Sequence, residues 1–392
     1  MSERYSCEGY ASAFRQRGRL CTHCVMDEGD PDLRFDEQGR CSGCREALAI
    51  EPAWRHTDAE RSPEFDATVE AIRRQNARGA YDTILGLSGG VDSSWALVCA
   101  AKAGLRVLVM HCDTGWDSRE SVDNIFNLCQ RLGFALQTIV VDWESMRAAQ
   151  RAFFLAGVAN CDIPQDHAII ATVNDVAVRN GIRTFLSGGN WVGESILPDA
   201  WGHDALDIVH LRDVWKKAGD RHLMRRFPTF GTVRRHVINP FLRRMNAWRI
   251  LDHLRYDPGE ARACLEREYG WSSYGLKHCE SVFTRVFQCV YLPMRFGFDK
   301  RRAHLASLVV SGLRSRDSAL AELAQPPMSQ DDAERGAEYL CSKLGFSAEE
   351  WRRMVTSPPV PHTRYRVDTL ERLAVSWAKK HLAHRMKLRK VK

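Results

Sequence analysis

The chain has 392 residues, a length that allows two or three domains. Its residues are 44% hydrophobic and 27% charged, which is typical of a soluble globular protein. No apolar run is long enough for a bilayer span, and the charged N-terminus lacks the apolar core of a signal peptide, so we expect a cytoplasmic protein. The net charge of +7 does not indicate a basic body, because seven of the 56 Lys and Arg lie in the last sixteen residues and the 49 acidic residues balance the rest.

Two Cys-x-x-Cys pairs follow a short leader. Cys21 and Cys24 are separated from Cys41 and Cys44 by sixteen residues. Four thiolates at this spacing suit a closed tetrahedral site for structural Zn²⁺. A redox dithiol is the alternative, but it does not need two matched pairs. The other cysteines are scattered through apolar segments, which favours buried thiols in a reducing compartment.

Strands and helices alternate after a partly helical segment over residues 51–80. The predicted strands cover residues 81–87, 106–113, 135–142 and 183–189, and the predicted helices cover 92–104, 119–133, a stretch through 151, and 166–181. This alternation predicts an α/β domain with a parallel sheet and helices on both faces. The pattern changes near residue 200. Residues 211–250 are rich in Arg, and the chain after Pro258 is expected to be mostly helical.

The segment SGGVDSS connects the first predicted strand to its helix. Its glycines allow backbone N–H groups to approach an oxyanion closely, and the helix directs free N–H groups and its dipole at the same point. A tight turn with a polar helix cap is the alternative, but it does not require so many small residues. The candidate anion-binding residues are Ser88, Gly89, Gly90, Asp92, Ser93 and Ser94.

This loop resembles the pyrophosphate loop (PP-loop) of the N-type ATP pyrophosphatases, a group that includes GMP synthetase, asparagine synthetase and tRNA-thiolating enzymes. The resemblance implies an adenine nucleotide alpha hydrolase-like domain, in which the loop holds the β- and γ-phosphates of ATP while a substrate oxygen attacks the α-phosphate. Asp92 would then hold Mg²⁺, which prefers oxygen ligands. His111 and Asp113 end the second strand and are expected to meet adenine and ribose, with a helix cap as the alternative for Asp113.

A wider set of segments is similar to the N-acetyl sugar amidotransferases of bacterial surface-polysaccharide synthesis. In chain order these segments are CTHCVMD, FDEQGRCSGC, LGLSGGVDSS, HCDTGWDS, IPQDHAIIAT, SGGNWVGESILP, YGLKHCESVFTRVFQ, LPMRFGFDKRRAHLASLVVSG and SPPVPH. The resemblance implies that the enzyme adenylates the N-acetyl carbonyl of a UDP- or CMP-linked sugar and replaces its oxygen with ammonia. The product is an acetamidino sugar for lipopolysaccharide (LPS) O-antigen or another surface glycan. Glutaminase and cyclase-like partner subunits are implied as the source of ammonia.

Further polar residues are expected at the carboxyl edge of the sheet, where ligands bind in open parallel sheets. His167 is the candidate general acid or base, with a structural role beside a helix cap as the alternative. Lys277 is expected to neutralise charge that develops on the phosphates. The other candidates are Gly188 and Asn190 for the nucleotide, and Asp166, Glu194, His278, Glu280, Arg301 and Arg302 for the sugar substrate. For Arg301 and Arg302 a solvated basic face is the alternative.

These observations divide the chain into four parts. They are a leader with the zinc knuckle (1–50), the PP-loop domain (51–200), a helical substrate region (201–365) and a basic tail (366–392). A tRNA-thiolating enzyme is the alternative function. Such enzymes need a reactive cysteine or an iron–sulfur cluster, yet no Cys-x-x-Cys occurs beyond Cys44, and Val91 stands where many of them carry Lys. Nucleic acid is therefore not expected as a partner.

Overall fold

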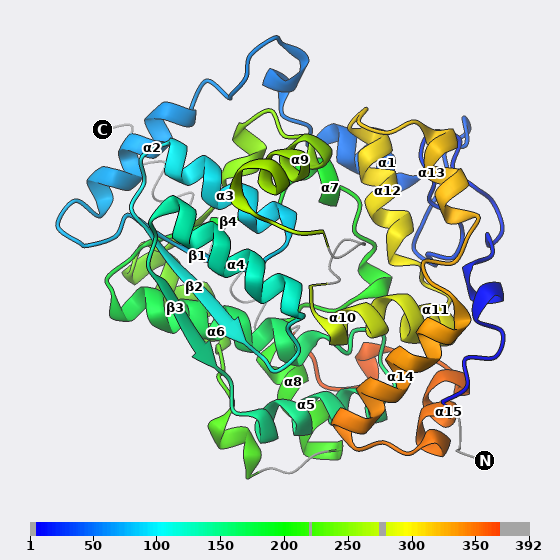
Figure 1. Ribbon diagram of the computed structural model, residues 1–392. Coiled ribbons are helices and arrows are strands. Elements are labelled where there is room, and N and C mark those ends of the chain that lie inside the picture. Colours follow the sequence, from blue (N-terminus) through cyan, green and yellow to red (C-terminus); the bar gives the residue numbers. More distant parts are fainter. Residues whose placement is uncertain (1–4, 219–221, 274–279, 369–392) are drawn as a thin grey trace.

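A five-stranded parallel sheet forms the centre of the protein, as the computed structural model shows for residues 5–218, 222–273 and 280–368 (Figure 1). The strand order is β3-β2-β1-β4-β5, and every neighbouring pair is parallel. The strands are β1 (Thr83–Gly86), β2 (Val107–Asp113), β3 (Leu136–Val140), β4 (Thr184–Ser187) and β5 (Asn246–Arg249). The expected α/β class with a parallel sheet is confirmed.

The helices between the strands cover both faces of the sheet. They are α3 (Val91–Lys102), α4 (Arg119–Leu132), α5 (Trp143–Ala156) and α6 (Ile163–Arg179). Figure 1 shows α3 and α4 in front of the strands and α6 behind them. Local sequence defines the ends of α4, because the Ser118 side chain accepts a hydrogen bond from the N–H of Ser121 at its start and Gly133 takes a left-handed φ of 72° at its end.

The edge strand β5 was not predicted. It lies inside the Arg-rich segment 211–250 and pairs in parallel with β4, where Leu186 is in register with Trp248. Of its four residues, Trp248 alone is buried. A strand so short and so polar carries little of the periodic signal on which sequence-based assignment depends.

The rest of the described chain is mostly helical, as expected for the C-terminal region. The α-helices are α1 (Ser42–Ala49), α2 (Phe65–Gln75), α7 (Trp191–Glu194), α8 (Ile208–Ala218), α9 (Pro258–Tyr269), α10 (Val282–Val286), α11 (Leu292–Phe296), α12 (Lys300–Val310), α13 (Arg316–Leu323), α14 (Gln330–Leu344) and α15 (Ala348–Thr356). Two π-helical segments, η5 (Arg234–Leu242) and η7 (Phe287–Tyr291), and short 3₁₀ turns complete the chain. Among the described helices, none has both the length and the apolar character needed to cross a bilayer.

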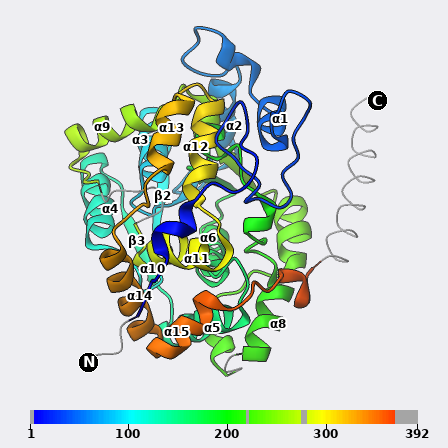
Figure 2. The same cartoon turned by 90° about the vertical axis from the view of Figure 1, so that its right-hand side faces the viewer.

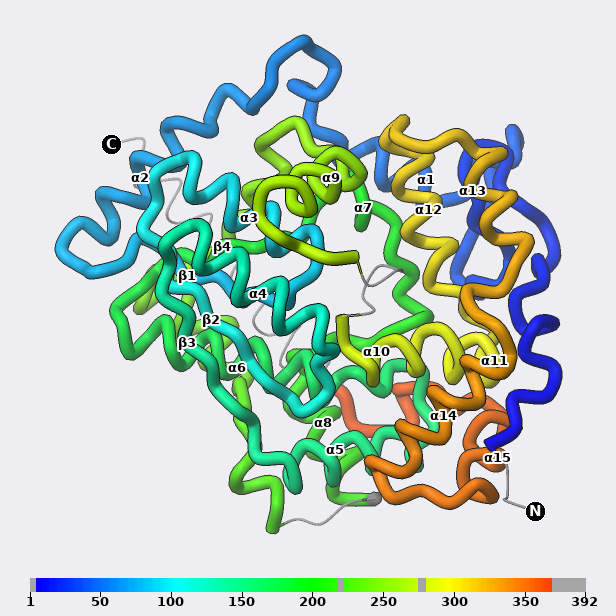
Figure 3. The backbone as a smooth tube through the Cα atoms, in the orientation of Figure 1, coloured from blue at the N-terminus to red at the C-terminus, as the bar shows by residue number. Residues whose placement is uncertain are grey.

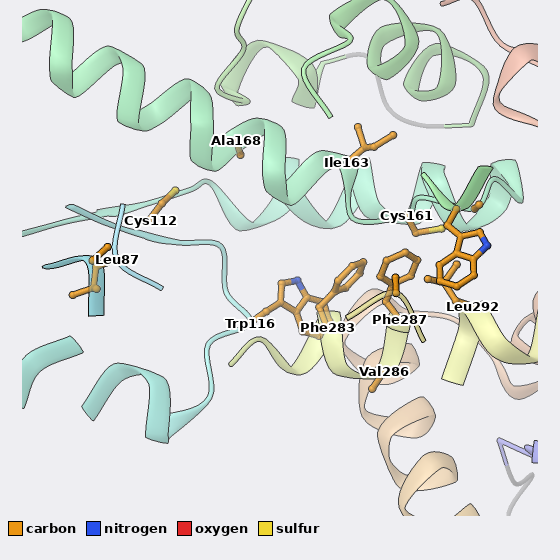
Figure 4. Close-up of a cluster of buried hydrophobic side chains, with 14 of the residues drawn as sticks. Leu87, Cys112, Trp116, Cys161, Ile163, Ala168, Phe283, Val286, Phe287 and Leu292 are labelled. Atoms are coloured by element: carbon orange, nitrogen blue, oxygen red, sulfur yellow. The ribbon is translucent and has the colours of Figure 1, made fainter. Parts of the chain in front are cut away.

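An aromatic core joins the sheet region to the C-terminal helices (Figure 4). Trp116, just after β2, packs against Phe283 of α10 with ring centroids 5.3 Å apart, and Phe154 of α5 lies 4.8 Å from Tyr291 of η7. The indole N–H of Trp116 donates to the buried Gln150 side chain at 2.8 Å, so its polar atom is satisfied. The two regions therefore share one continuous core.

The N-terminal segment packs against the C-terminal helices. In Figure 3 the blue N-terminal part of the tube runs beside α14 and α15. The Tyr5 hydroxyl donates to the carbonyl of Phe346, and the N–H of Cys7 donates to Glu334 of α14. The N-terminal segment thus supports helices that lie more than 300 residues later in the chain.

Candidate active site

Two glycine-containing loops meet at the carboxyl edge of the sheet. One follows β1 and the other follows β4, which lies on the opposite side of β1 from β2. From β1 the chain continues to β2 on one side, whereas from β4 it continues to β5 on the other side. Open parallel sheets bind ligands at such a switch point. The loops touch, because a Cβ atom on Gly188 would lie only 2.8 Å from the backbone nitrogen of Ser93. A glycine is therefore required at position 188.

The loop after β1 has the shape of an anion cradle. Gly89 has a φ of +81°, and a Cβ atom there would lie 2.5 Å from the carbonyl oxygen of Ser121 in α4. The carbonyl of Gly89 accepts a hydrogen bond from the Trp271 indole at 2.8 Å. The hydroxyls of Ser88 and Ser93 lie 3.1 Å apart across the loop. Helix α3 begins directly afterwards, with no side chain capping its N-terminus.

A cavity of about 490 Å³ opens above these two loops. Several predicted site residues line it together, although they come from positions more than 200 residues apart in the sequence. They are Ser88, Gly90, Asp92, Ser93, Gly188, Glu194, Glu280 and Arg301. Helices α9 and α12 form other parts of the wall, and Lys300 and His304 of α12 face the space. The fold thus gathers residues of the loop after β1 and C-terminal residues around one cavity.

Asp92 is held at the cavity by a tyrosine that the sequence did not point to. The Tyr256 hydroxyl donates a short hydrogen bond to the Asp92 carboxylate. Burial and the nearby charges of Asp92 and Glu194 raise the pKa of Tyr256 well above its usual value, so it remains a donor. Tyr256 precedes Pro258 in a short irregular segment, and no motif marks it.

The three basic residues that begin α12 have different roles. The guanidinium of Arg301 makes a two-pronged ion pair with Asp299, at 2.7 and 3.0 Å, and donates to the carbonyls of Glu322 and Gln325. Most of its donors are therefore occupied, although it lines the cavity. Arg302 points away from the cavity and is buried, with Asp27 at 3.2 Å. The prediction that Arg302 binds substrate is not supported, because it connects α12 to the N-terminal segment.

His167 does not reach the cavity. It is fully buried, with Nδ1 2.8 Å from the carbonyl of Ala205 and Nε2 accepting the N–H of Phe230 at 2.9 Å. Both ring nitrogens are occupied by backbone groups, and burial lowers its pKa. The geometry therefore does not support His167 as the general acid or base, and the structural alternative holds.

Several other predicted residues shape the loops rather than line the cavity. Asn190 is buried and caps α7, since its side chain accepts the N–H of Gly193 at 2.7 Å and donates to the carbonyl of Gly188. Ser94 is buried, and its hydroxyl has no hydrogen-bond partner in the described chain. Asp113 accepts the N–H of Gly115 at 2.7 Å, so it fixes a turn after β2 instead of capping a helix.

His111 contacts the start of the loop that follows β1. Its Nδ1 is 3.1 Å from the carbonyl of Leu87, and its Nε2 is 3.0 Å from the Asp117 carboxylate. Burial lowers the pKa of His111, but the hydrogen bond and charge of Asp117 outweigh this and the net change is upward. Lys277 and His278 lie outside the described residues.

The four cysteines of the N-terminal knuckle form a compact set. All four are fully buried and their sulfur atoms lie within 4.8 Å of one another, with Cys21–Cys44 at 3.9 Å and Cys24–Cys41 at 3.6 Å. Tetrahedral thiolates with Zn–S bonds of about 2.3 Å lie about 3.8 Å apart. Backbone N–H groups also point at the sulfurs, including that of Cys41 toward Cys21 at 3.3 Å. The donor set therefore fits a structural Zn²⁺.

The knuckle packs against the helices that form the cavity wall (Figure 2). Arg316 of α13 donates to the carbonyl of Cys21 at 2.8 Å and to that of Cys24 at 3.0 Å. Arg302 of α12 donates to the carbonyl of Val25 at 2.7 Å. The position of α12, and of Lys300 at its start, thus depends on the knuckle.

A second group of potential ligands, His203, His210 and His362, has a different arrangement. His210 Nε2 and His362 Nδ1 lie 2.6 Å apart, while His362 Nε2 accepts the N–H of Asn160. The neutral His362 ring therefore carries its proton on Nδ1 and donates it to His210. These contacts use the ring-nitrogen lone pairs that a metal would need. The cluster is therefore best described as a hydrogen-bonded group that joins α8 to the turn at His362.

We expect this histidine group to make the fold sensitive to acid. Burial and neighbouring histidines lower the pKa of His210 to about 4 and that of His362 to about 3. Because unfolded histidine titrates near 6.5, the unfolded chain binds more protons below that pH, and stability falls as the pH drops from about 6.5 toward 4. The loss between pH 7 and pH 5 should be about 2–4 kcal/mol.

The measurement is the free energy of unfolding at pH 7 and pH 5 for the wild type and for His362→Gln. The variant should lose part of the pH dependence, whereas His56→Gln should retain it, because the His56 side chain is 70% exposed. An unchanged pH dependence in His362→Gln would contradict the expectation.

Comparison with known proteins adds a family for part of the chain. Residues 280–380 match the model of the family "LPS biosynthesis protein WbpG-like, C-terminal domain". No curated protein matches the chain. The similar solved structures include an NH3-dependent NAD synthetase from Campylobacter jejuni, with 15% identity and a TM-score of 0.26 over 53% of this chain and 93% of that one.

Another similar structure is a glutamine-dependent NAD⁺ synthetase from Acinetobacter baumannii in complex with ADP. It shares 16% identity with a TM-score of 0.27, over 62% of this chain, which spans about half (48%) of that protein. The segment with the family match supplies Glu280, Lys300 and Arg301 to the cavity. The expected resemblance to a surface-polysaccharide family is thus confirmed for this segment, which is similar to the C-terminal domain of WbpG-like LPS biosynthesis proteins.

Proposed function

We propose that the protein is an ATP-dependent amidotransferase that acts on an N-acetyl sugar carried by a nucleotide. ATP would place its β- and γ-phosphates on the loop from Ser88 to Ser93, with Asp92 as the ligand for Mg²⁺. The acetamido oxygen would attack the α-phosphate, pyrophosphate would leave, and ammonia would displace AMP to give the acetamidino sugar. The observation that carries this proposal is the single cavity that joins an intact phosphate loop to the WbpG-like segment.

Physical chemistry explains why activation would be needed. An amide carbon is a poor electrophile, and hydroxide is a worse leaving group than AMP, so adenylation of the oxygen lowers the barrier to attack by ammonia. The four cysteines would hold structural Zn²⁺, and a separate glutaminase with a cyclase-like subunit would supply ammonia. Glu194, Glu280 and Arg301 are the proposed contacts for the sugar nucleotide.

The alternative of tRNA thiolation has weaker support. That chemistry needs a thiolate or a cluster at the site, whereas burial raises the pKa of Cys99 to about 12 and that of Cys112 to about 11. Neither residue lines the cavity. Cys289 does line it, so transfer RNA belongs in the assay as a control substrate.

The test is incubation of the purified chain with ATP, Mg²⁺, ammonium and a panel of UDP- and CMP-linked N-acetyl sugars. We expect AMP and pyrophosphate, not ADP, and a sugar product about one mass unit lighter because NH replaces O. Glutamine alone should not support the reaction, whereas glutamine with glutaminase and cyclase-like partners should. An unchanged mass for every sugar nucleotide, together with sulfur-modified tRNA, would overturn the proposal in favour of thiolation.

A further inference from the structure

The cavity extends from the loop after β1, past helix α7, to helix α12. The loop after β4 touches the backbone of Ser93 at Gly188, and α7 begins three residues later. In α7 the carbonyl of Gly193 accepts a hydrogen bond from Nδ1 of His304 in α12 at 3.2 Å. Figure 1 shows α7 between α3 and α12. Helix α12 therefore forms a wall of the cavity that α7 separates from the loop after β1.

One side of α12 faces this part of the cavity. Lys300, His304 and Leu308 all line it, and residues spaced four apart lie on the same side of an α-helix. The chain at α7 meets α12 at His304 and, through the N–H of Ile196, at the hydroxyl of Ser307. Lys300 lies before these contacts, about 6 Å along the helix axis from His304. Its ammonium group therefore belongs to the part of the cavity that is remote from the loop after β1.

Lys300 differs from the arginines that line the same cavity. The guanidinium groups of Arg301 and Arg314 each form an ion pair at 2.7 Å with a carboxylate of the protein. Arg262 has no ion pair among the described residues, but it is exposed on α9, where water solvates it. Lys300 is half-buried, and within the described chain its ammonium group forms neither a hydrogen bond nor an ion pair.

An ammonium group that is partly withdrawn from water needs a compensating negative charge. Burial lowers the pKa of Lys300, and the charges of Asp166 and Asp162 oppose this change, but neither carboxylate forms an ion pair with it. Asp162 accepts hydrogen bonds from a side-chain amide and a hydroxyl. Asp166 is exposed and does not line the cavity, so the prediction that it binds the sugar is not supported. Lys300 thus offers its charge to a ligand in the cavity.

The proposed reaction requires two separate anionic groups in this cavity. ATP would place its β- and γ-phosphates on the loop from Ser88 to Ser93, and the acetamido oxygen would have to reach the α-phosphate. The same sugar carries the phosphate of its own nucleotide, a few bonds from the acetamido group. Phosphates of the two substrates repel each other when they are adjacent. The phosphate of the sugar nucleotide therefore needs a cation of its own, away from the loop.

We propose that Lys300 binds the phosphate of the nucleotide that carries the sugar. This inference rests on the proposed function, and it names the residue that makes the site select a nucleotide-linked sugar over a free one. The lysine ammonium is a compact charge with three N–H donors, which can contact phosphate oxygens without a fixed geometry. The contacts of α12 with the chain at α7 hold the backbone from which this side chain extends.

The experiment measures the binding of the carrier nucleotide alone. UDP and CMP are titrated into the wild type and Lys300→Met by calorimetry, with Mg²⁺ and a non-hydrolysable ATP analogue at saturation, so that the loop after β1 is already filled. We expect the nucleotide that binds the wild type to bind Lys300→Met about ten-fold or more weakly, because a charge-assisted contact is lost. The ATP analogue should keep its affinity in the variant. Lys300→Arg retains the charge and should recover most of the UDP or CMP binding.

Lys216→Met is the matched control, because Lys216 is exposed on α8 and does not line the cavity. It should bind both nucleotides as the wild type does. Unchanged UDP and CMP binding in Lys300→Met, or an equal loss of affinity for the ATP analogue, would overturn the inference. Wild-type protein that binds neither UDP nor CMP would also overturn it. The proposed function would still stand if the wild type formed AMP and an acetamidino sugar, and it would fall if no sugar nucleotide gave AMP.

Discussion

Replacement of Asp92 by Asn should reduce the formation of AMP and pyrophosphate by two to three orders of magnitude, or about 3–4 kcal/mol of transition-state stabilisation. Asp92 is the one acidic residue in the first turn of α3, it lines the cavity, and it receives the Tyr256 hydroxyl. Asn keeps its size but removes the negative charge that a Mg²⁺ ligand needs. The measurement is the initial rate of pyrophosphate release at saturating ATP.

The fold should survive this change. An acidic residue in the first turn of a helix contributes about 0.3–1 kcal/mol through the helix dipole, so the melting temperature should fall by only a few degrees. Asp66→Asn is a suitable control, because Asp66 has the same position in α2 but its side chain is 68% exposed and does not line the cavity. Full activity in Asp92→Asn would show that the loop does not work as proposed.

Tyr256→Phe provides an intermediate test of the same site. It removes one hydrogen bond to Asp92 and leaves the carboxylate charge in place. A loss of about ten-fold in rate is expected, since hydrogen bonds to charged groups contribute about 1.5–3 kcal/mol. If Tyr256→Phe were as severe as Asp92→Asn, the hydroxyl itself would have to take part in the reaction.

The parallel sheet and its four central connections were predictable because their signals are local. Each of the strands β1 to β4 is a short apolar run followed by a helix, and nearby residues mark helix ends, as Ser118 and Gly133 do for α4. The glycine-rich loop after β1 was equally recognisable from its SGGVDSS pattern, and in the structure Gly89 stands where a Cβ atom would collide with backbone. β5 was missed because its place in the sheet depends on pairing with β4 and not on its own composition.

The face of a helix that meets a cavity was harder to predict than the helix itself. Asp166 and His167 are neighbours, but consecutive residues on a helix point about 100° apart, so both cannot face the same space. The structure exposes Asp166 and buries His167 against backbone groups. The same argument applies at the start of α12, where Lys300 lines the cavity while Arg302 binds the N-terminal segment. Choosing between such neighbours requires the tertiary packing, which a single sequence does not provide.

Removal of the Zn²⁺ that we propose for the cysteine knuckle should affect stability more than any other change considered. Structural zinc sites contribute about 10–16 kcal/mol of apparent binding free energy in isolated zinc-finger peptides. In this chain the site also orients the carbonyls of Cys21 and Cys24 toward Arg316, and that of Val25 toward Arg302. We therefore expect Cys44→Ser to lower the melting temperature by about 10 °C, as a loss of about 8 kcal/mol would do in a protein of this size.

Catalysis should fall together with stability, because the helices that receive the knuckle also carry cavity residues. Without it, Arg302 and Arg316 lose their carbonyl partners and the buried ion pair of Arg302 with Asp27 is exposed to water. Lys300 would then no longer be fixed at the cavity, so activity should decline even below the melting temperature. Elemental analysis of freshly purified, unchelated protein should find one zinc per chain in the wild type and much less in Cys44→Ser. Cys129→Ser, a buried thiol on α4, should retain the zinc and most of the stability; wild-type protein without zinc would refute the metal assignment.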